Sequence, residues 1–245
     1  MTRYKIILEY DGTHFEGWQT QPSGKGVQDH VEKALAAFNA ESPSTTVAGR
    51  TDTGVHALGQ VISVDIAREI TPEKLCDALN AHLRHTPIVA LHAEMTAPDF
   101  SARRDAKMRH YRYIVYCRKP PTALLAKRVW HMRYLLNLSA MQTAAMDFVG
   151  SHDFTSFRSA ACQSTRPQRS IDAFMVTQHD EEIWFEVSAR AFLHHQVRNM
   201  VGTLVEIGRG QRATDDIPRI IAARDRSTAG LTAPPWGLYF VKVDY

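Results

Sequence analysis

The residue types best suited to chemistry lie together in residues 49–56, which read Gly-Arg-Thr-Asp-Thr-Gly-Val-His. A carboxylate, Asp52, and a guanidinium, Arg50, stand two residues apart between glycines, and glycine lets the backbone approach a ligand closely. An aspartate that a nearby cation keeps ionised can act as a nucleophile or as a base. The same segment would also suit an ordinary β-turn in which the Asp52 side chain bonds its own backbone. The spacing leaves both interpretations open.

Two arginines are candidates for holding the Asp52 carboxylate. Arg50 is close in sequence, but it can equally point toward a substrate. Arg198 lies one position off the apolar stripe of a predicted helix, and a guanidinium beside a buried face usually has an anionic partner. The spacing does not identify Asp52 as that partner.

Motifs for several other kinds of chemistry are absent from the sequence. It contains no phosphate-binding Gly-x-x-x-x-Gly-Lys-Ser/Thr loop, no Gly-x-Gly-x-x-Gly fingerprint and no zinc-deaminase pair of motifs. His194 and His195 are adjacent, so on a helix their side chains would point about 100° apart and make a poor metal pair. Nucleotide-cofactor chemistry therefore lacks support, and phosphoryl transfer and metal-dependent hydrolysis are weak candidates.

The positive charge is concentrated in one part of the chain. The 245 residues carry a net charge of +3, yet residues 103–133 hold ten Lys or Arg against one acid, Asp105. Tyrosines and a tryptophan are interleaved with these cations. A charge run is often only a solvated face, but cations among aromatic rings also suit a nucleic acid, whose phosphates they neutralise and whose bases they stack against. The distribution favours an RNA or DNA partner.

The remaining composition is that of an ordinary soluble protein. The three cysteines have no paired spacing, which argues against disulfides and a Cys-rich zinc site. We see neither an apolar signal-peptide core nor a run long enough to cross a membrane. The expectation is a reduced, cytoplasmic protein.

Hydrophobic periodicity predicts the elements that position these residues. The first half has the order β-α-β-β-α-β, with the polar loop of residues 49–56 between two strands and a helix start at Thr71-Pro72-Glu73. The second half repeats this order. It has a helix capped by Asn137 or Ser139 and closed by Gly150, a hairpin of strands 171–176 and 183–187 around the acidic turn of residues 179–182, and its clearest helix over residues 197–208. We expect an α+β protein of two split-βαβ (ferredoxin-like) halves, residues 1–102 and 103–245. Each half would form an antiparallel sheet with helices on one face, and either the open face or a cleft between the halves would be free for a ligand.

Several motifs together resemble one family, the tRNA pseudouridine synthase A family. Residues 49–56 match its active-site motif residue for residue, and the likeness extends over nearly the whole chain. The other matching segments are residues 10–13, 17–19, 27–28, 111–113, 156–157 with Cys162 and Arg169, 192–202 and 234–238. The Arg-Thr-Asp-Thr-Gly core is the most specific of these. Trp236 departs from the polar residue or histidine that the family more often has.

The resemblance implies isomerisation of uridine to pseudouridine at positions 38, 39 and 40 of the tRNA anticodon stem-loop. Asp52 would be the essential carboxylate and Arg198 its ion-pair partner, while Arg50 would enter the stem where the flipped uridine left. Tyr111 would stack on the target base, although Tyr113 shares its strand face and the pattern does not choose between them. The resemblance leaves open whether Asp52 attacks the ribose or the base.

The resemblance also implies the partners of the protein. It predicts a homodimer in which one tRNA contacts both copies, and no cofactor. Arg103, Arg104 and Lys119 would grip backbone phosphates, and Leu238 would belong to the substrate-binding set. Two rival interpretations remain: a tRNA-binding or folding protein without chemistry, and a nucleoside hydrolase. The hydrolase needs a second acid opposite Asp52, for which the N-terminal motifs offer Glu9, Asp11 and Glu16.

Overall fold

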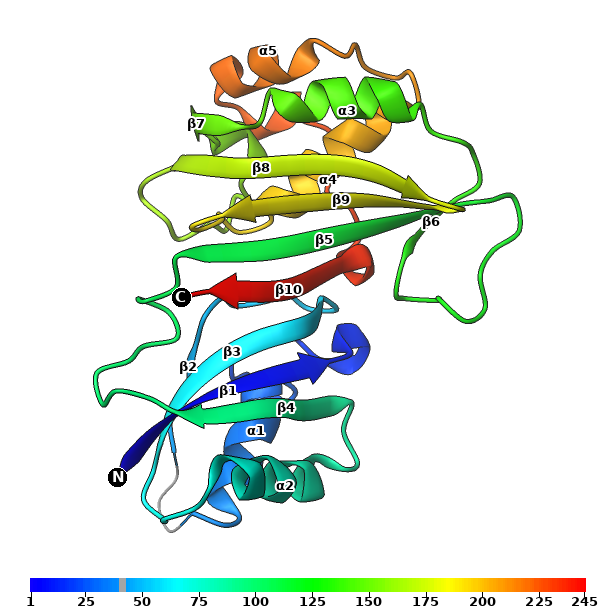
Figure 1. Ribbon diagram of the computed structural model, residues 1–245. Helices are drawn as coiled ribbons and strands as arrows, with labels where there is room; N and C mark the ends of the chain where they lie inside the picture. Colours follow the sequence, from blue (N-terminus) through cyan, green and yellow to red (C-terminus); the bar gives the residue numbers. More distant parts are fainter. Residues whose placement is uncertain (40–42) are drawn as a thin grey trace. The chain divides into compact units, whose positions relative to one another are not determined.

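The computed structural model describes residues 1–39 and 43–245 and is a mixed α+β structure (Figure 1). It divides into two compact units: unit 1 comprises residues 1–109 and 239–245, and unit 2 comprises residues 110–238. The expected boundary lay seven residues earlier, and the last strand was expected in the second half. Residues 239–245 fall in unit 1, where Tyr239 and Phe240 of that strand pair in parallel with His56 and Ala57.

The sheet of unit 1 is built around its first strand. β1 lies between β3 and β4 and is antiparallel to both, with Ile6 opposite Ile62 on one side and Ala93 on the other. β2 pairs antiparallel with β3, and β10 pairs parallel with β3. The strands are β1 (Thr2–Tyr10), β2 (Thr46–Val47), β3 (His56–Ile66), β4 (Ile88–Met95) and β10 (Leu238–Asp244).

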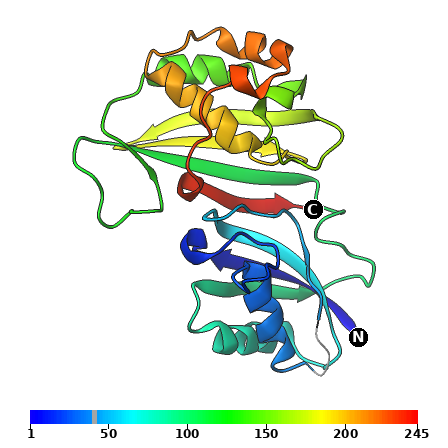
Figure 2. The ribbon, with the colours of Figure 1, turned by 180° about the vertical axis from the view of Figure 1, so that it is seen from behind.

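Two helices cover one face of this sheet, α1 (Val27–Ala36) and α2 (Pro72–Leu83), as Figure 2 shows from behind. The predicted start of α2 is confirmed: the Thr71 side chain accepts the Lys74 N–H, and proline occupies the first turn. Alternate residues of β1 point toward the helices and are buried with their apolar stripes. These buried side chains are Tyr4, Ile6, Leu8 and Tyr10 of β1, Val31 and Leu35 of α1, and Leu75 and Leu79 of α2.

Unit 2 has a sheet with the strand order β5-β9-β8-β7, and β6 pairs in parallel with β5. The predicted hairpin around Asp180 is confirmed; it joins β8 to β9, with His179 opposite Glu182. Asp180 supplies the left-handed turn conformation at φ 52°. The strands are β5 (Met108–Cys117), β6 (Trp130–Met132), β7 (Gly150–Asp153), β8 (Gln168–His179) and β9 (Glu182–Ala189).

The helices of unit 2 are α3 (Leu138–Met146), α4 (Gln196–Gly208) and α5 (Asp216–Ala223). The apolar stripe predicted for α4 is buried, as expected. Asn137, one of two expected caps of α3, accepts the Ala140 N–H. α3 ends earlier than expected, because Gly150 starts β7 rather than closing the helix. Short 3-10 turns occupy Gly12–His14, Thr155–Phe157, Arg226–Thr228 and Pro235–Gly237.

No helix within residues 1–39 and 43–245 combines the length and the apolar character that crossing a bilayer demands.

Candidate active site

The predicted loop of residues 49–55 connects β2 to β3 in unit 1, so the expectation of a polar loop between two strands is confirmed. It contains a turn in which the Val55 N–H donates to the Asp52 carbonyl oxygen at 3.1 Å. Gly54 completes this turn with φ +78°, a conformation that favours glycine. The turn uses the backbone of Asp52. Its carboxylate is half-buried, and Arg50 is exposed.

A buried set of polar side chains holds the start of the loop. The Tyr10 hydroxyl and Thr51 Oγ1 share a hydrogen bond of 2.8 Å. The Gln60 amide Nε2 donates to the Gly49 carbonyl oxygen at 2.7 Å and to the Tyr10 hydroxyl oxygen at 3.4 Å. Burial raises the pKa of Tyr10 to about 12, against the opposing effect of its hydrogen bonds with Gln60 and Thr51. Tyr10 therefore keeps its proton through the physiological range.

The N-terminal motifs pack directly on this loop. The Trp18 N–H donates to the Thr51 carbonyl oxygen at 3.0 Å, and the Gly54 N–H donates to the Phe15 carbonyl oxygen at 3.3 Å. Gly17 has φ +91°, and a Cβ there would lie 2.7 Å from the Thr51 carbonyl oxygen. A Cβ on Gly12 would lie 2.0 Å from the carbonyl oxygen of Val55. Both glycines are needed because backbone approaches backbone at these points.

His56 ends the loop and was given no role by the sequence argument. Its side chain is buried, its ring stacks on Tyr239 with centroids 4.8 Å apart, and its Nδ1 accepts the Gly12 N–H at 3.0 Å. The same nitrogen lies 3.1 Å from Asp11 Oδ1. His56 thus ties the end of the loop to the first N-terminal motif.

The cations of residues 103–133 divide into two groups. Arg103 and Arg104 are exposed, as phosphate contacts must be. Arg109 is 9% exposed and donates to the carbonyl oxygens of Ala48 (2.7 Å) and Arg103 (2.8 Å). Arg112 stacks over Trp184, and its guanidinium also donates to Glu186. The charge run therefore overstates the number of cations that face solvent.

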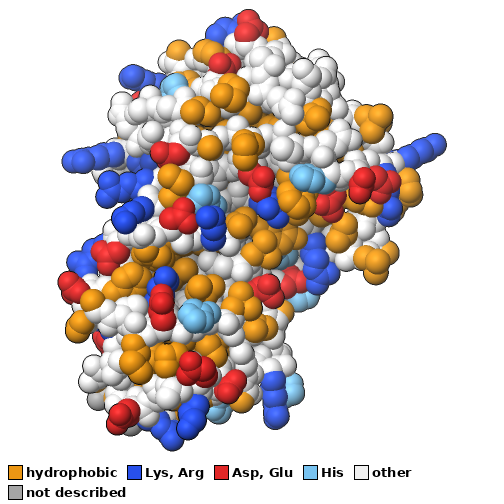
Figure 3. Space-filling model, in the orientation of Figure 1, with side chains coloured by type: hydrophobic (Ala, Val, Ile, Leu, Met, Phe, Trp, Pro, Cys, Tyr) orange, Lys and Arg blue, Asp and Glu red, His pale blue; other side chains and the backbone are white. Residues whose placement is uncertain are grey.

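Residues 118–135, which we call the basic arm, connect β5 to α3 and include β6. Lys119 is exposed at its start. Arg118 donates to the carbonyl oxygens of Pro120 and Pro121, so local bonds shape this turn. The arm has no acidic residue and carries three highly exposed apolar or aromatic side chains, Leu124, Tyr134 and Leu135. On the face in Figure 3, charged side chains of both signs are interspersed with hydrophobic ones.

The structure distinguishes the two tyrosines of β5 that the sequence could not. Tyr113 is fully buried, and its hydroxyl donates to the Pro234 carbonyl oxygen at 2.7 Å. Burial raises the pKa of this hydroxyl well above its usual range. The Tyr111 ring is only half-buried and meets Phe192 edge-on with centroids 5.1 Å apart. Only Tyr111 of this pair presents a ring to solvent.

Arg198 lies in the first turn of α4 and is half-buried, as predicted. Its Nε donates to the Ala233 carbonyl oxygen at 2.8 Å, while the Ala233 N–H donates back to the Arg198 carbonyl oxygen at 3.1 Å. Arg198 belongs to unit 2 and Asp52 to unit 1, and their pairing stays a prediction. Leu238, the first residue of β10, is 5% exposed.

The placement expected for His194 and His195 is wrong. Both residues precede α4, and His195 adopts a left-handed backbone with φ 62°. Their rings lie 4.0 Å apart rather than on separate faces of a helix. Their side chains are therefore not set apart by the 100° step between adjacent residues of a helix.

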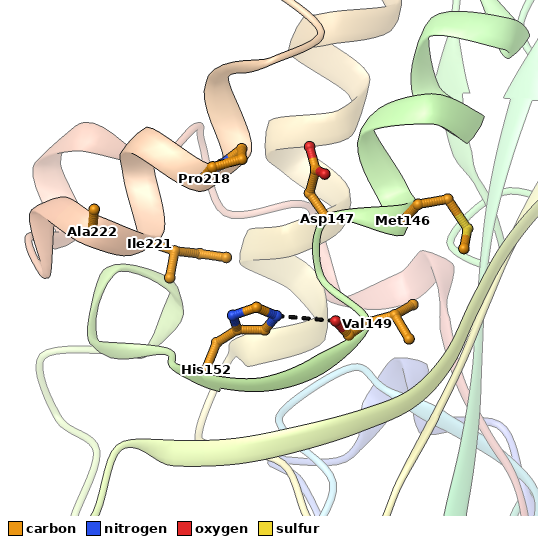
Figure 4. A pocket seen from close by; sticks show the side chains of 7 residues that line it. All are labelled: Met146, Asp147, Val149, His152, Pro218, Ile221 and Ala222. Carbon is orange, nitrogen blue, oxygen red and sulfur yellow. Dashed lines mark hydrogen bonds between the residues drawn. The ribbon is translucent and has the colours of Figure 1, made fainter.

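A surface pocket of about 410 Å³ lies in unit 2, between the end of α3, β7 and α5 (Figure 4). Its lining residues are Met146, Asp147, Val149, His152, Pro218, Ile221 and Ala222. The His152 Nε2 is bonded to the Val149 carbonyl oxygen at its wall. None of the predicted site residues lines this pocket.

Comparison with known proteins adds to this geometry. The model of the tRNA pseudouridine synthase family matches residues 6–103 and 144–245. The tRNA pseudouridine synthase A of Rhodospirillum centenum is 49% identical over all of both chains, and that of Bradyrhizobium sp. is 46% identical over all of both chains. The corresponding protein of Methylocella silvestris is 46% identical over all of this chain and 99% of its own.

A solved structure gives a more distant likeness. The crystal structure of a Cbf5-Nop10-Gar1 complex covers 82% of this chain and 45% of that chain, with 11% identity and a TM-score of 0.34. This likeness is too remote to support an argument about the site.

Proposed function

This chain belongs to the tRNA pseudouridine synthase family and is an isomerase, and we propose that it converts uridine to pseudouridine at positions 38, 39 and 40 of the anticodon stem-loop. Asp52 is the essential carboxylate in this proposal. The observation that carries it is the Asp52 loop, in which a half-buried carboxylate follows a residue held by buried hydrogen bonds. A carboxylate held in place is what covalent or proton-transfer catalysis requires.

The reaction breaks the bond from ribose C1′ to uracil N1 and forms a bond from C1′ to uracil C5. The C5 proton leaves, and N1 gains a proton, so the atoms balance within one substrate and a proton exchange with water. Asp52 assists by attacking the nucleoside or by taking a proton from it. Arg198 would hold the carboxylate ionised, because an adjacent cation lowers a carboxyl pKa.

A base inside a stem must leave the helix before this chemistry can occur. Arg50, exposed on the Asp52 loop, would occupy the vacated position, and the partly exposed ring of Tyr111 would stack on the flipped uracil. Leu238 would contribute to the apolar wall around the base. No metal or organic cofactor enters these steps.

The partner is tRNA, held through its phosphates by Arg103, Arg104 and Lys119, which are all exposed. We include in the proposal a cytoplasmic homodimer in which one tRNA contacts both copies. We also propose that each half of the chain is a split-βαβ unit. The antiparallel arrangement of β4, β1 and β3 supports this for unit 1, and the order β5-β9-β8 supports it for unit 2.

The test is tritium release from tRNA labelled at uracil C5, using substrates that carry uridine at only one of positions 38, 39 and 40. Wild type should release tritium from each substrate, and Asp52→Asn should not. Asp77→Asn, which alters an exposed carboxylate on α2, is the matched control and should release as much as wild type. Release by Asp52→Asn at the wild-type rate would refute the assignment of Asp52. Binding without any release would favour a tRNA-binding protein instead.

A further inference from the structure

We propose that Tyr10, Thr51 and Gln60 form a positioning network that sets the location of the Asp52 carboxylate. The inference rests on the proposed function, since it assigns these residues to a reaction that Asp52 performs. None of the three is proposed to touch the substrate.

Two of the three side chains reach the loop from different strands, and the third, Thr51, belongs to the loop itself. Tyr10 is the last residue of β1, and Gln60 lies within β3. Their exposed fractions are 2% and 0%, and that of Thr51 is 7%. Their hydrogen bonds end on Gly49 and Thr51, the residues three and one positions before Asp52. The network therefore holds the backbone that leads into the catalytic residue at two points.

The orientation of Gln60 is itself determined. Its Oε1 accepts the Val61 N–H at 3.1 Å, so its Nε2 must face the loop and the Tyr10 hydroxyl. An unsatisfied buried amide or hydroxyl would cost about 1–3 kcal/mol. Apolar residues could fill the same space without the cost of an unsatisfied polar group. The polar groups differ from apolar ones in that their hydrogen bonds fix the position of the loop.

A contrast on the same strand supports this interpretation. Tyr4 lies on the same face of β1 and is equally buried, but its hydroxyl donates to the Ile70 carbonyl oxygen, outside the Asp52 loop. Thr51, by comparison, is held twice. Its side chain bonds Tyr10, and its carbonyl oxygen accepts the Trp18 N–H at 3.0 Å. Displacing a catalytic group by about 1 Å can lower a rate by roughly 100-fold.

The experiment compares Tyr10→Phe with Tyr4→Phe, two identical chemical changes on one strand. Single-turnover tritium release is measured with enzyme in excess, together with the tRNA dissociation constant and the melting temperature. Tyr10→Phe should release tritium about 10- to 100-fold more slowly than wild type, with tRNA affinity unchanged. Tyr4→Phe should release tritium at the wild-type rate, even if its melting temperature falls as much as that of Tyr10→Phe.

A second pair of variants at Thr51 separates the hydroxyl from the rest of the side chain. Thr51→Ser retains the hydroxyl oxygen that hydrogen-bonds Tyr10 and should release tritium at the wild-type rate. Thr51→Val lacks this oxygen and should release tritium as slowly as Tyr10→Phe. This pair also serves if Tyr10→Phe fails to fold. The proposal would be overturned if Thr51→Ser and Thr51→Val released tritium at equal rates. It would also be overturned if Tyr4→Phe released tritium as slowly as Tyr10→Phe.

Amide hydrogen exchange over residues 49–55 reports on the network without requiring activity. Tyr10→Phe should speed exchange in this segment and leave α2 unchanged; unchanged exchange in the segment would also overturn the proposal. Failure of the proposed function can be distinguished from failure of this inference. If the proposed function is wrong, wild type itself releases no tritium.

Discussion

The Asp52 loop and the basic arm are both connections between regular elements, yet their side chains are used in opposite ways. In the Asp52 loop, buried polar groups from β1 and β3 hold the residues beside Asp52, and Gly12 and Gly17 let the N-terminal backbone pack against it. In the basic arm, the turn after Arg118 is shaped by its own local bonds, and large side chains point outward. Chemistry needs a group at one position, whereas phosphate binding needs only a density of charge.

The largest effect should come from the carboxylate itself. Replacing Asp52 with Ala should lower the rate of pseudouridine formation by at least about 1,000-fold, because no other described group is proposed to take its role. The tRNA dissociation constant, measured by filter binding, should change by less than about threefold. If the affinity for tRNA fell by as large a factor as the rate, Asp52 would serve tRNA binding. The Asp52 loop and the basic arm would then not differ in function.

A smaller but still large effect is expected at Gly17. Gly17→Ala combines a positive φ with a Cβ 2.7 Å from the Thr51 carbonyl oxygen, so the loop must move. We expect a rate lowered about 10- to 100-fold and a lower melting temperature. Gly24→Ala is the matched control, since Gly24 also has a positive φ but no atom within 4 Å of the added Cβ. Gly24→Ala should lower the free energy of unfolding by about 1–2 kcal/mol at most, and its rate of pseudouridine formation should equal that of wild type.

The basic arm should respond in the opposite manner. Replacing Lys119 and Arg133, both exposed, with Gln should weaken tRNA binding several-fold and reduce the salt dependence of log Kd by roughly one for each lost phosphate contact. The single-turnover rate at saturating enzyme should not change. Lys74→Gln on α2 is the control cation. A reduced rate at saturation would show that the arm also positions the substrate.

The smallest effect is expected in a region that belongs to neither loop. Arg3 hydrogen-bonds Asp65 on β3, which lowers the pKa of that carboxyl. A lowered folded-state pKa stabilises the protein above the unfolded pKa of Asp65, and this contribution is lost as pH falls through the folded value. Asp65→Asn should therefore cost up to about 1 kcal/mol at neutral pH and nothing in strong acid. Urea unfolding at both pH values measures the difference.

Local sequence determined much of the secondary structure, and it predicted the chemistry of the site. The cap at Thr71, the apolar stripe of α4 and the turn at Asp180 depend on neighbouring residues, and each was predicted correctly. The motif around Asp52 likewise identified the loop between two strands. Short elements such as β6 and β7 were missed, because a strand of three or four residues has too few positions to show a period.

Tertiary structure decided how those residues are held. Thr51 meets Tyr10 across 41 positions of sequence, and such bonds leave no trace in local periodicity. The same holds for Arg109, whose place in a run of exposed cations concealed its buried bond to Ala48. The pairing of β10 with β3 likewise joins segments far apart in the sequence. Sequence alone predicted the carboxylate and its chemistry, and only the folded chain could supply the distant donors that hold its loop in place.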